Sequence, residues 1–214
     1  IHKVGLEVGS RVIRARGIAM DIIGTLGGKT IHPVCAIPGG MSKAINEEER
    51  ATFEATAREE IEFALFSLDL FRETVLKNKA YVDMILSDAY TMQTYYMGLV
   101  DDQNHVNFYD GQVRVVDPTG KQFVKYRPEQ YLEVVAEHVE PWTYLKLPFL
   151  KEVGWKGFVT GQDSGVYQAT PLSRLNASDG MATPRAQEAY EEFYRTLGGK
   201  PVHNTLATHW ARLV

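Results

Sequence analysis

The sequence predicts a mainly helical fold: a helical bundle core with a small antiparallel β insertion, α+β overall. Two long stretches, residues 4–26 and 47–77, carry apolar side chains at the spacing of amphipathic helices. Between residues 104 and 126 the spacing changes to that of short strands separated by turns. We therefore expect one unit over residues 1–214, with the β insertion at about 104–126.

Capping residues mark the ends of the two long helices. Gly27 stands where a helix C-cap favours glycine. Asn46 can cap the second helix while Glu49 reaches back to the Asn46 N–H, which is the capping-box arrangement. The apolar stretch that follows, residues 81–100, is expected to form another helix and a turn.

The β insertion is expected to be a three-stranded meander. The dipeptide Asp110-Gly111 favours a two-residue hairpin turn, so it predicts strands at 106–109 and 112–116. A second turn, rich in Asp, Pro and Gly, leads to a third strand at 122–126.

The rest of the chain is expected to be helical or irregular. Pro128 can open a helix that runs to about His138. Residues 141–168 lack a clear period and are expected to form an irregular, packed connection. A helix should run from Thr183 to the Gly-Gly pair at 198, and a last one should begin at about 204.

Composition excludes several classes of protein. The net charge of −4 gives no support for a nucleic-acid partner. No apolar run approaches the roughly 20 residues that a transmembrane helix needs, so no transmembrane segment is expected. The single cysteine, Cys35, excludes an internal disulfide framework and fits a reducing compartment, so a cytoplasmic location is expected.

Residues 27–40 combine unusual backbone chemistry with a histidine. Glycine pairs stand at both ends of the segment, and two prolines hold the chain between them extended. Because bulky apolar residues fill the interval, we expect a rigid, buried connector that presents His32 at a fixed place. Cys35 lies in the same apolar run, where a small buried hydrophobe is expected rather than a nucleophile.

Two blocks of this sequence resemble a known family. His32-Pro33 followed by Pro38-Gly39-Gly40, and the later block Pro171-Leu172-Ser173-Arg174-Leu175-Asn176, are similar in kind and order to segments of nickel–iron hydrogenase large (alpha) subunits, in particular the cytoplasmic type. The resemblance covers essentially the whole chain. It implies a parent protein that is a nickel-dependent hydrogenase, interconverting H2 with protons and electrons, and that passes electrons to an iron–sulfur small subunit.

The resemblance also implies what is missing. Such large subunits hold nickel and iron through two Cys-x-x-Cys pairs, and this chain has neither pair. It starts at Ile1 rather than methionine, so an interior fragment of a larger subunit is expected. The fragment is expected to be a catalytically inert scaffold without metal ligands or a bound cofactor, whereas the parent holds the nickel–iron centre. A piece cut from a complex is expected to self-associate.

The candidate site residues follow from the same two blocks. The resemblance implies that His32 lies at the subunit interface, where it donates a hydrogen bond toward the partner's iron–sulfur cluster without being a ligand. A buried histidine satisfied by backbone carbonyls is the alternative. Arg174 and Asn176 are candidates for the wall of the parent's active site, or Arg174 pairs with an internal carboxylate such as Asp179.

Two other classes of protein stay open at this stage. One is a quinone-site subunit of respiratory complex I, which is similar in ancestry and fold to the hydrogenase family and lacks the metal cysteines. The other is a non-catalytic scaffold or assembly protein of this length. The amino-acid sequence of the segment from His32 to Gly40 favours the hydrogenase.

Overall fold

The computed structural model describes residues 5–214, so the predicted helix start at Val4 lies outside the described residues. The chain divides into two compact units, Ile1–Glu73 and Thr74–Val214. None of the helices within the described residues is both long and apolar enough to span a membrane.

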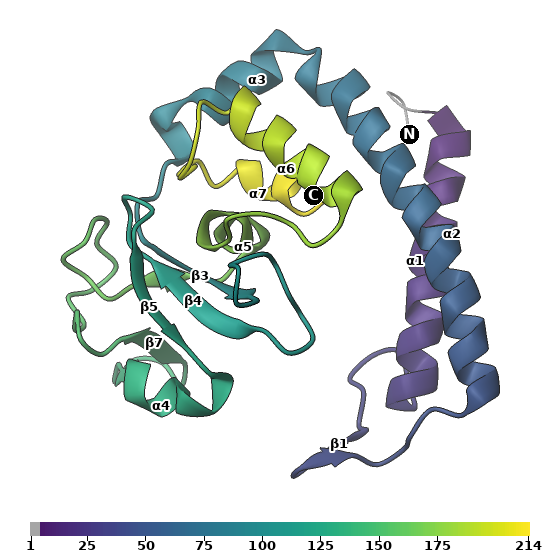
Figure 1. Ribbon diagram of the computed structural model, residues 1–214, viewed down its shortest axis with the longest axis horizontal. Coiled ribbons are helices and arrows are strands. Elements are labelled where there is room, and N and C mark those ends of the chain that lie inside the picture. Colours follow the sequence, from purple (N-terminus) through teal and green to yellow (C-terminus); the bar gives the residue numbers. More distant parts are fainter. Residues whose placement is uncertain (1–4) are drawn as a thin grey trace. The chain divides into compact units, whose positions relative to one another are not determined.

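The first unit is a hairpin of two long helices (Figure 1), α1 (Gly5–Gly27) and α2 (Glu47–Phe71). Both helices were predicted, and the capping box of Asn46 and Glu49 is confirmed at the start of α2. The helices run antiparallel, since Arg14 pairs with Glu59 at 2.8 Å and the Arg11 guanidinium lies 3.5 Å from the Phe66 ring centroid. Alpha-helix gives way to a π-helical turn at Arg72–Leu76.

The predicted bundle core is wrong for this unit. No residue of α2 is buried, and only Ala15 and Gly27 are buried in α1. Apolar side chains on α1 and α2 therefore face solvent; Leu6 and Ile13 are each 73% exposed. A single helix pair cannot enclose its apolar stripes, because each stripe needs a second layer to cover it.

The connector between the two helices is exposed rather than buried. It forms a minimal hairpin of β1 (Ala36–Ile37) and β2 (Gly40–Met41), with Ile31 and Val34 both more than two-thirds exposed. At its start the connector packs closely on the end of α1, since a Cβ at Gly27 would lie 2.5 Å from the Pro33 Cβ. This close contact supports part of the expected rigidity. The prediction of burial failed because within these residues no second layer covers the apolar run.

The second unit is built on a four-stranded sheet with the order β5-β4-β3-β8 (Figure 1). Its antiparallel part joins β3 to β4 and β4 to β5, whereas β8 pairs with β3 in parallel. A short helix α3 and a 3-10 turn precede the sheet. The bounds of these elements are α3 (Lys79–Leu86), the turn (Asp88–Tyr90), β3 (Tyr95–Val100), β4 (Gln112–Val116), β5 (Gln122–Tyr126) and β8 (Tyr167–Gln168).

The two faces of this sheet are covered differently. Helix α5 packs on β3 and β4, and α7 packs on α5, while ring contacts join α6 to α7. The other face carries the core cluster of Tyr95, Val115, Tyr126 and Leu150. The covering elements are α5 (Pro171–Ala177), α6 (Pro184–Thr196) and α7 (Ala207–Ala211), and on the other side a 3-10 turn (Pro128–Gln130), α4 (Tyr131–Val134), β6 (Val135–Val139) and β7 (Lys146–Leu150).

The fold class is therefore α+β, and the predicted helical bundle with a small β insertion is corrected. The sheet is the centre of the second unit, and it begins at Tyr95, before the expected insertion at 104–126. Residues 95–100, expected to be helical, form β3. The prediction was wrong because a strand buried on both faces is a continuous apolar run without period-two alternation, and such a run has the same sequence pattern as a buried helix.

Three further corrections follow from strand pairing. Residues 106–109 are not a strand; Val106 makes one isolated bridge to Val100, and β4 pairs with β3 instead. The helix expected at 128–138 ends at Val134, where the chain becomes β6 and pairs with β7. The stretch 141–168 contains β7 and β8, whereas the strands at 112–116 and 122–126 and the α6 helix are confirmed.

We expect Gly165→Ala to destabilise the second unit by about 1–3 kcal/mol, in the range of overpacking substitutions. A Cβ at this position would lie 2.6 Å from the Leu150 carbonyl oxygen and 2.9 Å from the Gly154 oxygen, both of which are backbone atoms. Urea denaturation followed by circular dichroism measures the effect. The matched control is Gly17→Ala on α1, where a Cβ meets nothing within 4 Å; equal losses in both variants would contradict this account.

Candidate functional site

Helix α5 carries two of the three predicted site residues, and its sequence explains its position. Thr170 caps the helix by accepting a hydrogen bond from the Ser173 N–H at 3.2 Å, and Pro171 occupies the first turn. The helix approaches β3 closely because Gly98 has no side chain; a Cβ there would lie 3.1 Å from the Arg174 Cα.

Asn176 is fully buried, and both polar atoms of its side chain form hydrogen bonds. Its Nδ2 donates to the Val202 carbonyl at 2.8 Å, and its Oδ1 accepts from the Val202 N–H at 3.1 Å and the Tyr194 hydroxyl at 3.0 Å. The side-chain amide therefore pairs with the backbone of Val202 as a neighbouring strand would. These bonds connect α5 to α6 and to the segment that follows α6.

Arg174 lies at the opposite side of α5, half-buried at a small cavity. Its guanidinium carbon lies 4.5 Å from the centroid of the Phe108 ring. Burial, together with the nearby charge of Arg212, lowers the pKa of Arg174 from its usual value. Asp179, the alternative partner expected for Arg174, pairs with Arg114 and Lys200 instead.

Two cations, the buried Arg114 and the more exposed Lys200, flank the exposed Asp179 at the end of α5. Arg114, only 7% exposed, lies 2.9 Å from an Asp179 oxygen and donates to the Ala177 carbonyl at 3.0 Å. Lys200 also reaches Asp179, at 3.3 Å, and donates to the Ser178 carbonyl. Asp179 is therefore the counter-ion of Arg114 and Lys200, and Arg174 has no part in this cluster.

The pKa of Asp179 is lowered by this cluster. Burial by itself raises it, but hydrogen bonds from Arg114 and Asn104 and the charges of Arg114 and Lys200 outweigh burial. A carboxyl with a lowered folded-state pKa stabilises the fold above its unfolded pKa, near 4, and this stability is lost as the pH falls through the folded-state value.

We therefore expect the wild type to lose stability between neutral pH and about pH 3, and the variant Asp179→Asn to lose less over the same interval. The variant should also be less stable than the wild type at pH 7, because Arg114 and Lys200 then lack the Asp179 carboxylate as their counter-ion. Urea midpoints measured at pH 7, 5 and 3 check this expectation. A variant and a wild type with parallel pH profiles would show that Asp179 does not contribute in this way.

His203 and Tyr96 form a partly buried polar contact in the same unit. The Tyr96 hydroxyl lies 2.6 Å from His203 Nδ1 and donates to the Met92 carbonyl at 3.2 Å. Burial lowers the pKa of His203 and raises that of Tyr96, so both side chains are neutral near pH 7. This pair connects β3 to the segment after α6 and is structural.

His32 lies in the first unit, on the exposed connector between α1 and α2, with a φ of 52° in the left-handed region. Few residues other than glycine adopt this conformation without cost. His32 belongs to the first unit, whereas Arg174 and Asn176 belong to the second. The role of His32 toward a partner's iron–sulfur cluster stays a prediction, as does the active-site role of the other two residues.

The chain is similar in sequence to subunits of hydrogenases. The chain is 42% identical over 214 residues to the iron–sulfur subunit of an F420-non-reducing hydrogenase from Archaeoglobus profundus, a match that covers 100% of the chain and 44% of the relative. It is 31% identical over 210 residues to the beta subunit of the NAD-reducing hydrogenase HoxS from Cupriavidus necator, covering 95% of the chain and 41% of that relative. No protein-family model matches the sequence.

A solved structure supports the same conclusion. The crystal structure of an NAD+-reducing NiFe hydrogenase in the H2-reduced state matches with a TM-score of 0.77 and 29% identity, over 97% of this chain and 44% of that one. These relatives are subunits of hydrogenases, which are oxidoreductases that act on H2. The chain spans less than half the length of the relatives that it matches.

The comparisons correct the predicted type of subunit. The Archaeoglobus relative is named an iron–sulfur subunit, so the assignments to a nickel–iron large subunit and to a parent nickel–iron centre are not kept. The predicted partner, an iron–sulfur small subunit, is corrected for the same reason. The relatives also give no support to the two alternatives, a complex I subunit and a scaffold or assembly protein.

The residues of this chain do not fit an iron–sulfur cluster. Such clusters are held by four cysteine thiolates or by closely related ligand sets, and the chain has one cysteine, Cys35. Within residues 5–214 no group of three or more His, Cys, Asp or Glu side chains is placed to hold a metal ion. Any cluster of the parent protein would need ligands from outside these residues.

Proposed function

We propose that this chain is a structural part of a hydrogenase subunit of the iron–sulfur type. The assembled enzyme would oxidise or produce H2, with the redox cofactors held by residues outside this chain. The observation that carries this proposal is the 42% identity to the Archaeoglobus protein along all 214 residues. The similar fold of a solved hydrogenase, with a TM-score of 0.77, supports the proposal by structure rather than by the name of a relative.

The chain would act in a complex with other hydrogenase subunits, in the cytoplasm. Its first unit supports the first part of this proposal, because exposed apolar residues lie on both helices and on the connector between them. Monomeric proteins rarely leave large contiguous apolar patches open to water. The most exposed of these residues are Leu6, Ile13, Ile31 and Val34.

Affinity purification tests the proposal. The polypeptide that contains these residues is tagged in its native cell and purified without detergent, and its partners are identified by mass spectrometry. We expect other hydrogenase subunits in stoichiometric amounts. Purification of the tagged polypeptide alone, or with subunits of an unrelated complex, would contradict the proposal. A second purification from cells with the tag on an unrelated cytoplasmic protein is the control.

A further inference from the structure

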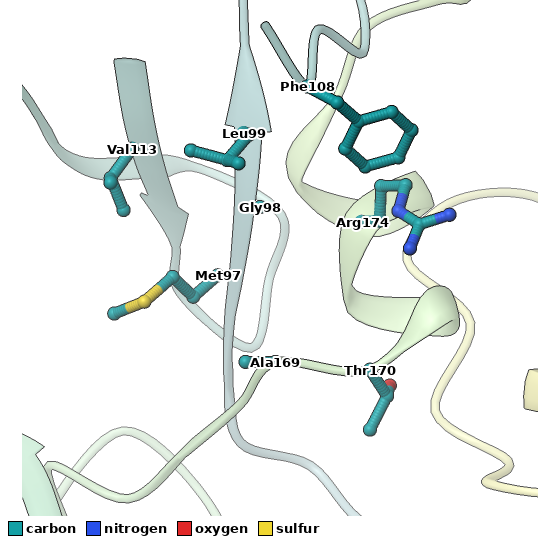
Figure 2. A pocket seen from close by; sticks show the side chains of 8 residues that line it. All are labelled: Met97, Gly98, Leu99, Phe108, Val113, Ala169, Thr170 and Arg174. Atoms are coloured by element: carbon teal, nitrogen blue, oxygen red, sulfur yellow. The ribbon is translucent and has the colours of Figure 1, made fainter. Parts of the chain in front are cut away.

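A small cavity lies beside β3, next to Arg174 (Figure 2). Its volume is about 250 Å³. Figure 2 shows Arg174 and Phe108 on the α5 side of β3, with the side chains of Met97, Leu99 and Val113 on the strands. All of these lining side chains except that of Arg174 are apolar, so the cavity combines one cation with an apolar wall.

The guanidinium of Arg174 has no counter-ion among the described residues. No carboxylate of the described chain forms an ion pair with it, and the charged group that affects it is another cation, Arg212. The guanidinium carbon lies 4.5 Å from the centroid of the Phe108 ring, and stacking of this kind leaves the planar N–H donors directed outward. Because Phe108 is itself 65% exposed, the stacked pair is accessible from solvent. The excess of positive charge therefore favours an anion at this place.

The other polar groups around the cavity are already bonded or covered. The Leu99 carbonyl accepts a hydrogen bond from the Asn107 N–H at 3.2 Å. A Cβ at Gly98 would lie 3.1 Å from a main-chain atom of α5, so this helix covers the strand there. The Thr170 hydroxyl is bonded to Ser173. A ligand would therefore find its hydrogen-bond donors at the guanidinium and apolar surface around it.

We propose that this cavity binds a small monocarboxylate with a short apolar tail. The carboxylate would accept two parallel hydrogen bonds from Arg174, because the arginine fork matches the geometry of a carboxylate. The tail would lie against Met97, Leu99 and Val113. A second anionic group on the ligand would face this apolar wall without a partner, which is costly. The cavity is smaller than the sites of drug-sized ligands, which begin at about 300 Å³, so the ligand has few non-hydrogen atoms.

Titration of the 214-residue chain with 3-methylbutanoate tests this proposal. One counterpart is 3-methylbutanamide, which keeps the shape without the charge, and the other is acetate, which keeps the charge without the tail. Nuclear magnetic resonance should show shifts at the Arg174 Nε–H and at the Met97 methyl group. We expect the acid to bind about fivefold to tenfold more tightly than either counterpart. The amide loses the charge-assisted contact, and acetate loses the burial of the tail.

Three variants localise the binding. Arg174→Met should remove the preference for the acid over the amide, and Arg174→Lys should keep part of it. Ala169→Leu, at an exposed position in the lining of the cavity, should weaken binding of the acid and leave that of acetate unchanged. The matched control is Arg195→Met, which removes an exposed arginine from α6 in the same unit and should bind the acid as the wild type does.

Three results would overturn the proposal. The first is equal binding of the acid and the amide, and the second is unchanged binding of the acid by the Arg174→Met variant. The third is binding of acetate as tight as that of 3-methylbutanoate, which would show that an anion binds the arginine at the surface without using the cavity.

Saturation-transfer difference spectra of the purified native complex test whether a free acid has access to the cavity in the assembled enzyme. We expect transfer from the complex to the methyl groups of 3-methylbutanoate, and none from a complex with Arg174→Met. No transfer from the wild-type complex, together with binding to the 214-residue chain, would overturn the assignment to a free acid in favour of a carboxylate of the assembled enzyme. The readout does not depend on H2 turnover, so failure here is distinguishable from failure of the proposed function.

Discussion

Replacing Asn176 with alanine is expected to lower the free energy of unfolding of the second unit by about 3–5 kcal/mol, since each unsatisfied buried group costs about 1–3 kcal/mol. The substitution leaves the Val202 N–H, the Val202 carbonyl and the Tyr194 hydroxyl without the partner that each now has. Burial raises the pKa of Tyr194, so its hydroxyl stays protonated near neutral pH and still needs a hydrogen-bond acceptor after the substitution.

Urea denaturation followed by tryptophan fluorescence measures this loss. The three tryptophans, Trp142, Trp155 and Trp210, all lie in the second unit, so fluorescence reports on it alone. The control is Glu188→Ala, at an exposed position on α6. We expect the control to stay within about 0.5 kcal/mol of the wild type. A loss below about 1 kcal/mol for Asn176→Ala would show that water or a shift of α5 replaces its bonds.

The second large effect is expected for Phe193→Ala, at about 3–5 kcal/mol, the range for buried aromatic residues cut to alanine. Phe193 is fully buried, and its ring centroid lies 5.1 Å from that of Trp210 and 5.1 Å from that of Tyr194. The substitution removes the ring that joins α6 to α7 and leaves a cavity between them.

Phe158→Ala is the matched control for this substitution. Phe158 is 71% exposed and contacts Trp155 edge-on, with ring centroids 5.2 Å apart. Its loss should cost about 1 kcal/mol or less. Because Trp155 and Trp210 are affected directly, the midpoints are measured by far-ultraviolet circular dichroism. Similar midpoints for the two variants would contradict the core assigned to α6 and α7.

The helices of this protein could be predicted from sequence where the periodicity was long and capped. Helix α2 begins after Asn46 as its capping box predicts, and α6 begins at the expected proline. These elements were predictable because capping and amphipathic spacing are local properties of the chain. The strands β4 and β5 also follow their local alternation and turns.

The remaining elements depend on partners that are distant in sequence. Strand β3 has the composition of a buried helix, and only its pairing with β4 and β8 makes it a strand. Strand β6 is helical by local pattern, yet it pairs with β7. The pairing of Asp179 with Arg114 rather than Arg174 is of the same kind. Asp179 and Arg114 are far apart in the sequence, and the packing of α5 on β3 and β4 brings them together.

The two sequence blocks could not predict the type of subunit. The blocks around His32 and Arg174 correctly indicated a hydrogenase relationship, since the relatives are hydrogenase subunits. They did not separate an iron–sulfur subunit from a nickel–iron large subunit, because a chain with one cysteine contains the cysteine ligand set of neither.

Hydrogen-dependent dye reduction tests the central claim most directly. The native complex is purified through a tag on the polypeptide that contains these residues, and reduction of methyl viologen is followed under H2 and under argon. We expect reduction under H2 alone, in the fractions that contain this polypeptide, and the same activity for a complex with the exposed Glu188→Ala substitution. An intact complex that contains the polypeptide and reduces no dye under H2 would contradict the assignment to a hydrogenase.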